Sequence, residues 1–179
     1  MIINEKYFKE YSPIPLNYNM KELKNYIKVA QEIWVRPLIG SELLDEIEEQ
    51  VKNNEVSEEN ATLLTDGGLW QYLCYGTCLE GLPFIWTNIS EVGITLGKSD
   101  NSDSVTLKDL TYIQQHLRNQ VEVLKDQLKK YICEHNESFP LADVCACGCN
   151  SCCQANPQLN KPNPNQEIYT TKRKNTNLK

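Results

Sequence analysis

The chain has little of what a membrane-spanning or secreted protein contains. Its 179 residues include no run of roughly 18 uncharged apolar residues, which a membrane-spanning helix would need. The first residues, MIINEKYFKEY, carry acids and lysines where a signal peptide has its apolar stretch. We therefore expect a protein of about one domain that stays inside the cell and has no membrane segment.

Catalytic motifs are missing as well. The chain has only two histidines, His116 and His135. It contains no Walker loop and no GxGxxG, GxSxG or HExxH motif. Because a catalytic site needs a convergent acid, base or nucleophile and no motif here points to one, we expect a protein that is not an enzyme.

The charge of the chain is negative overall but unevenly divided. Residues 1–156 carry 13 Lys and Arg against 23 Asp and Glu, whereas residues 157–179 carry five against one. An acidic body gains nothing by counterion release on a phosphate backbone, so free nucleic acid is not the expected ligand of the folded part. Eight of the acids lie between Glu42 and Glu59. Such a run is most often a solvated helix face, and the alternatives are that it lines a pore or repels a wrong partner.

Hydrophobic spacing predicts a mainly α-helical bundle. The first expected helix covers residues 19–36, with Ile33 among the apolar residues at helical spacing, and Pro37 and Gly40 end it. The second covers residues 41–53 and is capped by Ser41, and a short turn of helix follows Ser57. The buried segment 69–86 and a long C-terminal helix from Thr106 complete the bundle. A β-hairpin-like excursion over about 92–106, around the polar loop 98–103, separates the last two helices. It could equally be a mobile excursion, since two short strands are marginal alone.

The long C-terminal helix is the clearest predicted element. About thirty residues give a rod of roughly 45 Å, longer than a bundle of this size needs. We therefore expect part of its apolar stripe to pack on another subunit. The stripe consists of Leu110, Leu117, Val121, Leu124, Leu128 and Tyr131.

Both ends of the chain are predicted to be extended arms. Pro13 and Pro15 favour extended backbone near the N-terminus. From Asn156 onward the chain has almost nothing to bury, so this tail should be disordered alone, with Glu167–Thr171 best suited to add as a strand to a partner. The predicted divisions are an N-terminal arm (1–18), a helical domain (19–136), a Cys-rich segment (137–156) and an extended basic tail (157–179).

The cysteines are dense at one place. Of the eight, Cys74 and Cys78 lie one turn apart on a buried helix and are expected to be small core residues. Five others fall close together, after Cys133 and His135. Four of their thiolates, or three together with His135, are candidate ligands of a structural zinc ion, since CxxC spacing with an adjacent glycine wraps a metal. Disulfides formed after assembly and free thiols are the alternatives, because the pattern CxCxCxxCC is compressed relative to known zinc sites. The five candidates are Cys145, Cys147, Cys149, Cys152 and Cys153.

Several blocks of sequence resemble one known group of proteins. The blocks are Tyr11–Pro15, Ile33–Gly40, Leu82–Ile85, and Asp100–Ser102 followed by Leu107 and Gln115–Arg118. Together they resemble small neck proteins of tailed phages of gut Bacteroidetes, crAss-like phages among them. The resemblance spans about residues 1–140, and Arg36-Pro37-Leu38-Ile39-Gly40 is its most specific part.

The resemblance implies a structural virion protein of the head–tail connector type. Such a protein would form a ring of about twelve copies that joins the portal to the tail. DNA would pass through its acidic lumen without specific binding, and the ring would be assembled in the host cytoplasm. The alternative interpretation is an intracellular interaction module stapled by zinc or thiolates.

Overall fold

The computed structural model describes residues 1–13, 20–90, 93–96 and 107–143. Helices make up most of these residues, which confirms the prediction of a mainly helical fold. The elements are α1 (Glu5–Tyr11), α2 (Met20–Ala30), the π-helix η1 (Gln31–Val35), α3 (Arg36–Ile39), α4 (Ser41–Asn53), α5 (Glu58–Thr65), α6 (Leu69–Trp86), β1 (Thr87–Ser90), β2 (Gly93–Leu96) and α7 (Leu107–Glu134).

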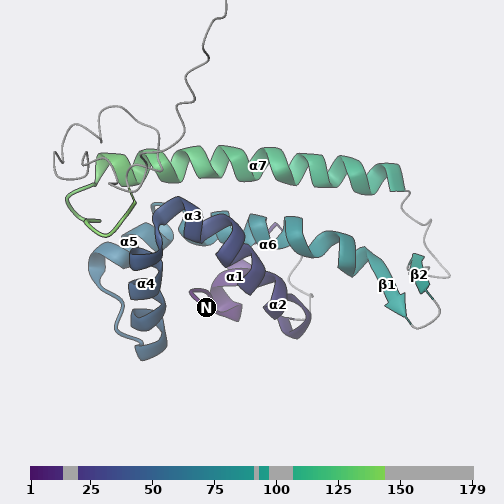
Figure 1. The fold of residues 1–179 in the computed structure, drawn as a ribbon, viewed down its shortest axis with the longest axis horizontal. Coiled ribbons are helices and arrows are strands. Elements are labelled where there is room, and N and C mark those ends of the chain that lie inside the picture. The colour runs from purple at the N-terminus through teal and green to yellow at the C-terminus, as the bar shows by residue number, and fades with distance from the viewer. Residues whose placement is uncertain (14–19, 91–92, 97–106, 144–179) are drawn as a thin grey trace, which may run out of the picture.

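Helix α6 lies at the centre of the molecule. Its apolar residues are spread around the helix and not confined to one face, and most of them are buried. It packs against α1, α2, η1, α5 and α7, and α7 runs along its length (Figure 1). Leu69, Leu73 and Cys74 are fully buried, each large aliphatic side chain contributing about 1.5–3 kcal/mol. The buried helix has the bounds that the sequence predicts.

The N-terminal residues are part of this core, so the predicted extended arm is wrong for the residues described. Glu5–Tyr11 is helical, and Ile2 and Phe8 are buried. Trp70 of α6 stacks on Tyr7 with ring centroids 4.0 Å apart, and its indole N–H donates to the carbonyl of Ile2. These N-terminal side chains pack on α6 and cover part of its apolar surface. The rest of the predicted arm lies outside the described residues.

Helices α2 and α3 are joined without a break by the π-helix. The backbone N–H of Arg36 bonds the carbonyl of Gln31, five residues earlier. The wider turn shifts the buried face along the chain: Val35 is fully buried, whereas Ile33, which the spacing places inside, is 52% exposed. Pro37 falls in the first turn of α3, where its missing N–H is tolerated, so the helical run ends only at the following glycine.

The acidic helix α4 is positioned as predicted. Leu43, Leu44 and Ile47 are buried, and α4 ends at Asn54 in the left-handed region. One detail differs from the prediction: Ser41 is the first helical residue and not the cap, because the preceding glycine occupies the cap position and no side chain caps the helix.

The next helix, α5, begins as its sequence suggests. The hydroxyl of Ser57 accepts a hydrogen bond from the backbone N–H of Asn60. A side-chain oxygen in this position satisfies one of the donors that a helix start leaves free.

The stripe of α7 is covered by the chain itself. Leu117, Val121 and Leu128 are at most 8% exposed, and Leu124 and Tyr131 pack against the same core. We expected part of this stripe to pack on another subunit, but the stripe packs against α6 of the same chain. Tyr112 and Val123 are the large apolar residues on the outer side of α7, 75% and 50% exposed.

The folded body extends beyond the predicted boundary at residue 136. After α7 the chain turns back, and Phe139 and Ala142 are buried. The backbone N–H of Asp143 then donates to the carbonyl of Ile39 at 3.1 Å. Residues 137–143 therefore belong to the helical body, because Phe139 fills a part of the core that α7 leaves open.

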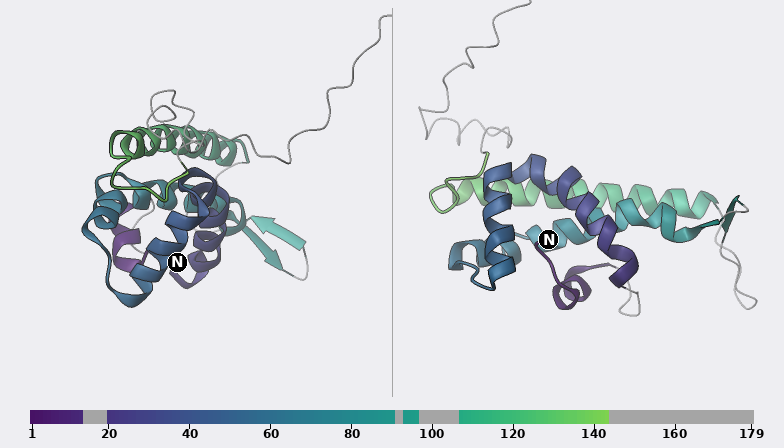
Figure 2. Two further views of the ribbon diagram at one scale, coloured as in Figure 1. Left: turned by 60° about the vertical axis from the view of Figure 1, so that its left-hand side comes forward. Right: turned by 60° about the horizontal axis from the view of Figure 1, so that its bottom comes forward.

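The two strands are adjacent in sequence. Thr87–Ser90 pairs antiparallel with Gly93–Leu96, with Thr87 opposite Leu96, and the pair projects from the helical body (Figure 2). The prediction placed the partner of 92–97 at 104–106 instead. A partner only two residues away pairs at a smaller entropic cost than one across the polar loop. Residues 97–106 lie outside the described part of the chain.

We expect Gly40→Ala to destabilise the protein more than Gly68→Ala. Both glycines have positive φ, +89° and +78°, which a side chain makes costly. A Cβ at Gly40 would also lie 3.1 Å from the backbone nitrogen and Cβ of Asp143, whereas nothing lies within 4 Å of a Cβ at Gly68. Urea unfolding should show a loss of about 1 kcal/mol for Gly68→Ala and about 2–3 kcal/mol for Gly40→Ala.

Equal losses for the two variants would contradict this expectation. They would mean that the segment around Asp143 moves away from α3 at no cost, and that its packing does not stabilise the body.

Candidate functional site

The block from Arg36 to Gly40 forms the corner between η1 and α4. The guanidinium of Arg36 donates from Nε and Nη2 to the two carboxylate oxygens of Glu32, at 2.6 and 3.1 Å, and from Nη1 to Asp45 at 2.9 Å. Hydrogen bonds to Glu32 and then to Asp45 raise the pKa of Arg36 above its usual range. The ion pairs are partly exposed, so each stabilises the fold little and mainly fixes the angle between the two helices.

Buried polar groups behind this corner are all paired. The side-chain oxygen of Gln31, which is 3% exposed, accepts from the backbone N–H of Ile2. The amide nitrogen of Asn60 donates to Glu46 and to Gln50. Within the described residues, every buried side-chain nitrogen or oxygen has a hydrogen-bond partner. These groups therefore hold the fold and leave no unsatisfied atom aimed at a substrate.

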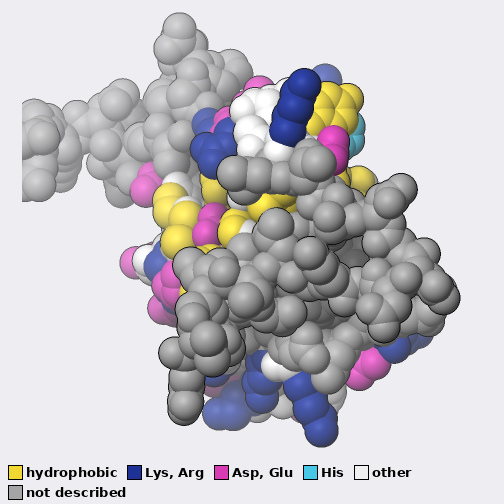
Figure 3. Space-filling model, turned by 90° about the vertical axis from the view of Figure 1, so that its right-hand side faces the viewer, with side chains coloured by type: hydrophobic (Ala, Val, Ile, Leu, Met, Phe, Trp, Pro, Cys, Tyr) yellow, Lys and Arg dark blue, Asp and Glu magenta, His cyan; other side chains and the backbone are white. Residues whose placement is uncertain are grey.

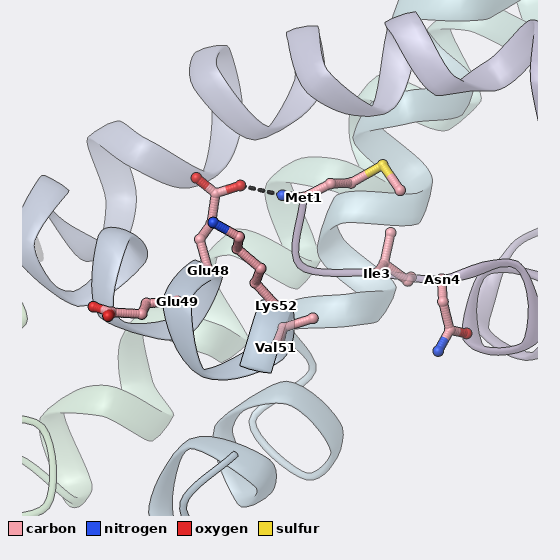
Figure 4. A pocket seen from close by; sticks show the side chains of 7 residues that line it. All are labelled: Met1, Ile3, Asn4, Glu48, Glu49, Val51 and Lys52. Carbon is pink, nitrogen blue, oxygen red and sulfur yellow. Dashed lines mark hydrogen bonds and ion pairs between the residues drawn. The ribbon is translucent and has the colours of Figure 1, made fainter. Parts of the chain in front are cut away.

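One open pocket lies between the N-terminal residues and α4 (Figure 4). It has a volume of about 640 Å³, and Glu48 forms an ion pair there with the amino group of Met1. Burial by itself disfavours the carboxylate of Glu48, but hydrogen bonds from the Met1 amino group and from Gln31 outweigh it, so the pKa of Glu48 is lowered. Glu49 points away from the N-terminal residues. The ion pair ties the start of the chain to α4.

A second pocket, of about 500 Å³, lies between α4, α5 and the segment that follows α7. Its walls combine apolar side chains with carboxylates. Glu46 on its wall already accepts hydrogen bonds from Gln50 and Asn60, and the hydroxyl of Ser57 already caps α5. The lining residues include Leu43, Glu46, Glu59, Glu137, Pro140 and Leu141.

The candidate zinc ligands Cys145, Cys147, Cys149, Cys152 and Cys153 lie outside the described residues. Of the residues upstream, Cys133 is partly exposed, and the ring of His135 stacks on Tyr131 with centroids 4.3 Å apart. In the part of the chain that is described, no three His, Cys, Asp or Glu side chains are grouped to hold a metal. The zinc site therefore stays a prediction.

Cys74 and Cys78 are core residues, as the sequence indicates. Both are buried, and their sulfurs lie 3.9 Å from the carbonyl of Phe8 and 3.7 Å from the hydroxyl of Ser12. Burial raises the pKa of both thiols, that of Cys78 to about 12. Their sulfurs are therefore protonated and unreactive at neutral pH.

Large apolar side chains reach the surface on α2, η1 and the end of α6. Val29 is 41% exposed, and Ile33 and Phe84 are each 52% exposed. Tyr26 joins them, because its ring stacks on Phe84 with centroids 5.8 Å apart. We call these four residues the α2–α6 surface. Sequence reasoning missed it, since helical spacing predicts that Ile33 faces the core and nothing local announces the π-helix.

The chain is thus a helical body built around one buried helix, with apolar side chains at its surface. None of the helices within the described ranges is long and apolar enough to cross a membrane. The chain belongs to a family of unknown function, DUF6712, whose model matches residues 35–151. That span contains the Arg36–Gly40 corner and α4 to α7. No curated protein and no solved structure matches the chain.

We expect the buried thiols to make the protein less stable in alkali. Between pH 8.5 and 10 an unfolded chain releases the thiol protons of Cys74 and Cys78, whereas the folded chain keeps them, so the free energy of unfolding should fall as pH rises. Well above the unfolded pKa the slope should approach about 1.4 kcal/mol per pH unit for each thiol. Urea unfolding under reducing conditions at several pH values measures this dependence of the free energy of unfolding on pH.

The double variant Cys74→Ala/Cys78→Ala is the control. The double variant should be less stable at neutral pH, because the smaller side chains leave cavities in the core. Its free energy of unfolding should fall less steeply than that of the wild type as pH rises. A slope unchanged in the double variant would show that other groups cause the alkaline loss.

Proposed function

We propose that this chain is a structural connector subunit of a phage neck. Copies of it would form a ring that joins the portal to the tail and continues the DNA channel. The observation that carries the proposal is the exposure of Ile33 and Phe84 on a body whose core is complete. Contiguous apolar groups on the surface of a folded domain mark an interaction site.

The distribution of charge supports the same proposal. Helices α4 and α5 carry the exposed carboxylates of Glu42, Asp45, Glu49, Glu58 and Glu59, with Lys52 as their one basic residue. A ring whose lumen carries negative charge lets DNA slide through without adhering. The basic tail, residues 157–179, would contact an acidic surface of an adjacent neck or portal protein.

The resemblance to phage neck proteins supports it through the Arg36–Gly40 block. In the structure this block is the corner that orients α4 relative to η1, and both elements carry exposed groups suited to binding. A corner of fixed angle is what a ring subunit needs, because a small error in angle repeats at each interface and prevents closure.

Native mass spectrometry of the full chain, under reducing conditions without chelator, tests the proposal. We expect a closed assembly of about twelve copies, alone or on the portal protein of the same phage. A chain that stays monomeric in both conditions would overturn the proposal. A monomer that binds one zinc ion stoichiometrically would instead support the interaction module stapled by its cysteine cluster.

A further inference from the structure

Two neighbouring pockets form one groove at the end of the molecule where α4, α5 and the C-terminal end of α7 lie (Figure 1). The pocket of about 500 Å³ and a smaller one of about 220 Å³ share Glu59, Ser138 and Phe139 as wall residues. The two pockets are therefore continuous along α5 and the segment that follows α7. We call them together the α5 groove.

The walls of the α5 groove are acidic. None of the described residues that line it is Lys or Arg. Glu46 accepts hydrogen bonds from the amides of Gln50 and Asn60, which are neutral and leave its charge uncompensated. Three further glutamates are exposed and form no ion pair with any described residue; we call them the groove glutamates. They are Glu58, Glu59 and Glu137.

The opposite end of the molecule differs in charge. The space-filling view of that end shows Lys and Arg side chains close to the acidic ones (Figure 3). In the α5 groove the carboxylates have no such neighbours, so they repel one another, and an occupant with positive charge relieves this repulsion.

Part of the lining of the α5 groove is apolar. Leu43 and Phe139 line it and belong to the core, at 2% and 1% exposed. Pro140 and Leu141 line it as well, and Leu141 is 37% exposed. A segment that carries apolar and basic side chains close together therefore fits both parts of the lining.

The described part of the chain ends at the edge of this groove. Pro140 and Leu141 are wall residues, and shortly after them the backbone N–H of Asp143 donates to the carbonyl of Ile39. This hydrogen bond fixes the point from which residues 144–179 continue, and that point is beside the groove.

The chain itself contains a segment with the required composition. Residues 167–174 read EIYTTKRK, with Ile168 and Tyr169 followed closely by the basic triplet Lys172-Arg173-Lys174. Residues 144–171 connect this triplet to Asp143, and a flexible chain of that length has an end-to-end distance of roughly 30 Å. Such a tether gives an effective concentration in the millimolar range, so a contact too weak to join separate molecules can be well populated within one chain.

We propose that residues 167–174 bind in the α5 groove of their own chain. The basic triplet pairs with the groove glutamates, and Ile168 and Tyr169 contact the apolar part of the lining. An acidic surface of another protein must then compete with the groove for the tail, so the contact holds the tail back in the single chain. This inference concerns one chain and does not depend on the proposed ring.

Limited trypsin digestion of the full chain tests the inference, because trypsin cuts after Lys and Arg and so reports whether the basic triplet is accessible. The variant Glu58→Gln/Glu59→Gln/Glu137→Gln removes the groove charges and adds no trypsin site. Under reducing conditions we expect the triplet of the wild type to be cut about tenfold more slowly than that of this variant. Mass spectrometry of the intact chain and its fragments measures the two rates.

A second variant controls for the loss of negative charge. Glu10→Gln/Glu49→Gln/Asp126→Asn removes the same number of charges from exposed residues that do not line the α5 groove. Circular dichroism should show both variants folded. The triplet of this control should stay as protected as that of the wild type.

Nuclear magnetic resonance of the full chain gives a second readout. Replacing the basic triplet by Lys172→Gln/Arg173→Gln/Lys174→Gln should shift the backbone amide signals of Glu59, Ser138 and Leu141, which line the groove. The signal of Glu10, on α1, should not move. Amide signals of the groove that are unchanged would show that the triplet does not bind there.

The outcomes separate this inference from the proposed function. Equal cutting of the triplet in the wild type and in the groove variant overturns the inference, whether or not the chain forms a ring. Protection that is lost on dilution also overturns it, because the tail then binds the groove of another copy. A protected triplet in a chain that forms no ring supports the inference and counts against the ring alone.

Discussion

The fold depends on the burial of α6. Because the apolar residues of this helix are spread around it, neighbouring elements pack on several of its sides. Helix α7 lies along it, η1 and α2 pack on another side, and α1 closes a third. On two of these sides, Trp34 packs over Gly76 and Trp70 stacks on Tyr7. Because the N-terminal residues are needed for this cover, they are core and not arm.

The same packing creates the surface on which the proposed function rests. Trp34 can lie on α6 and Val35 can be buried only if the helix widens between them and Gln31, and the π-helix supplies that widening. Ile33 is exposed as a consequence. The packing of the core thus leaves apolar side chains exposed on α2, η1 and α6, while exposed carboxylates lie on α4 and α5.

The chain belongs to a family of unknown function, so a functional proposal must be based on the residues of the structure. Its buried polar groups are paired and its described cysteines are buried or partly buried, so these groups stabilise the described part of the fold. The cluster Cys145–Cys153 is a separate question. In the sequence the cluster follows the segment whose Asp143 donates a hydrogen bond to Ile39, and it lies outside the described residues.

Local patterns in the sequence determined the elements whose signals are local. The local signals include the apolar spacing of α4 and α7, the left-handed Asn54 and the capping Ser57. Only the tertiary structure decided the rest. Three features depend on packing between segments that are distant in the sequence. They are helix α1, the π-helix and the burial of Phe139. The α2–α6 surface was missed for the same reason: a π-helix is unfavourable by itself and persists where packing such as that of Trp34 on Gly76 compensates it.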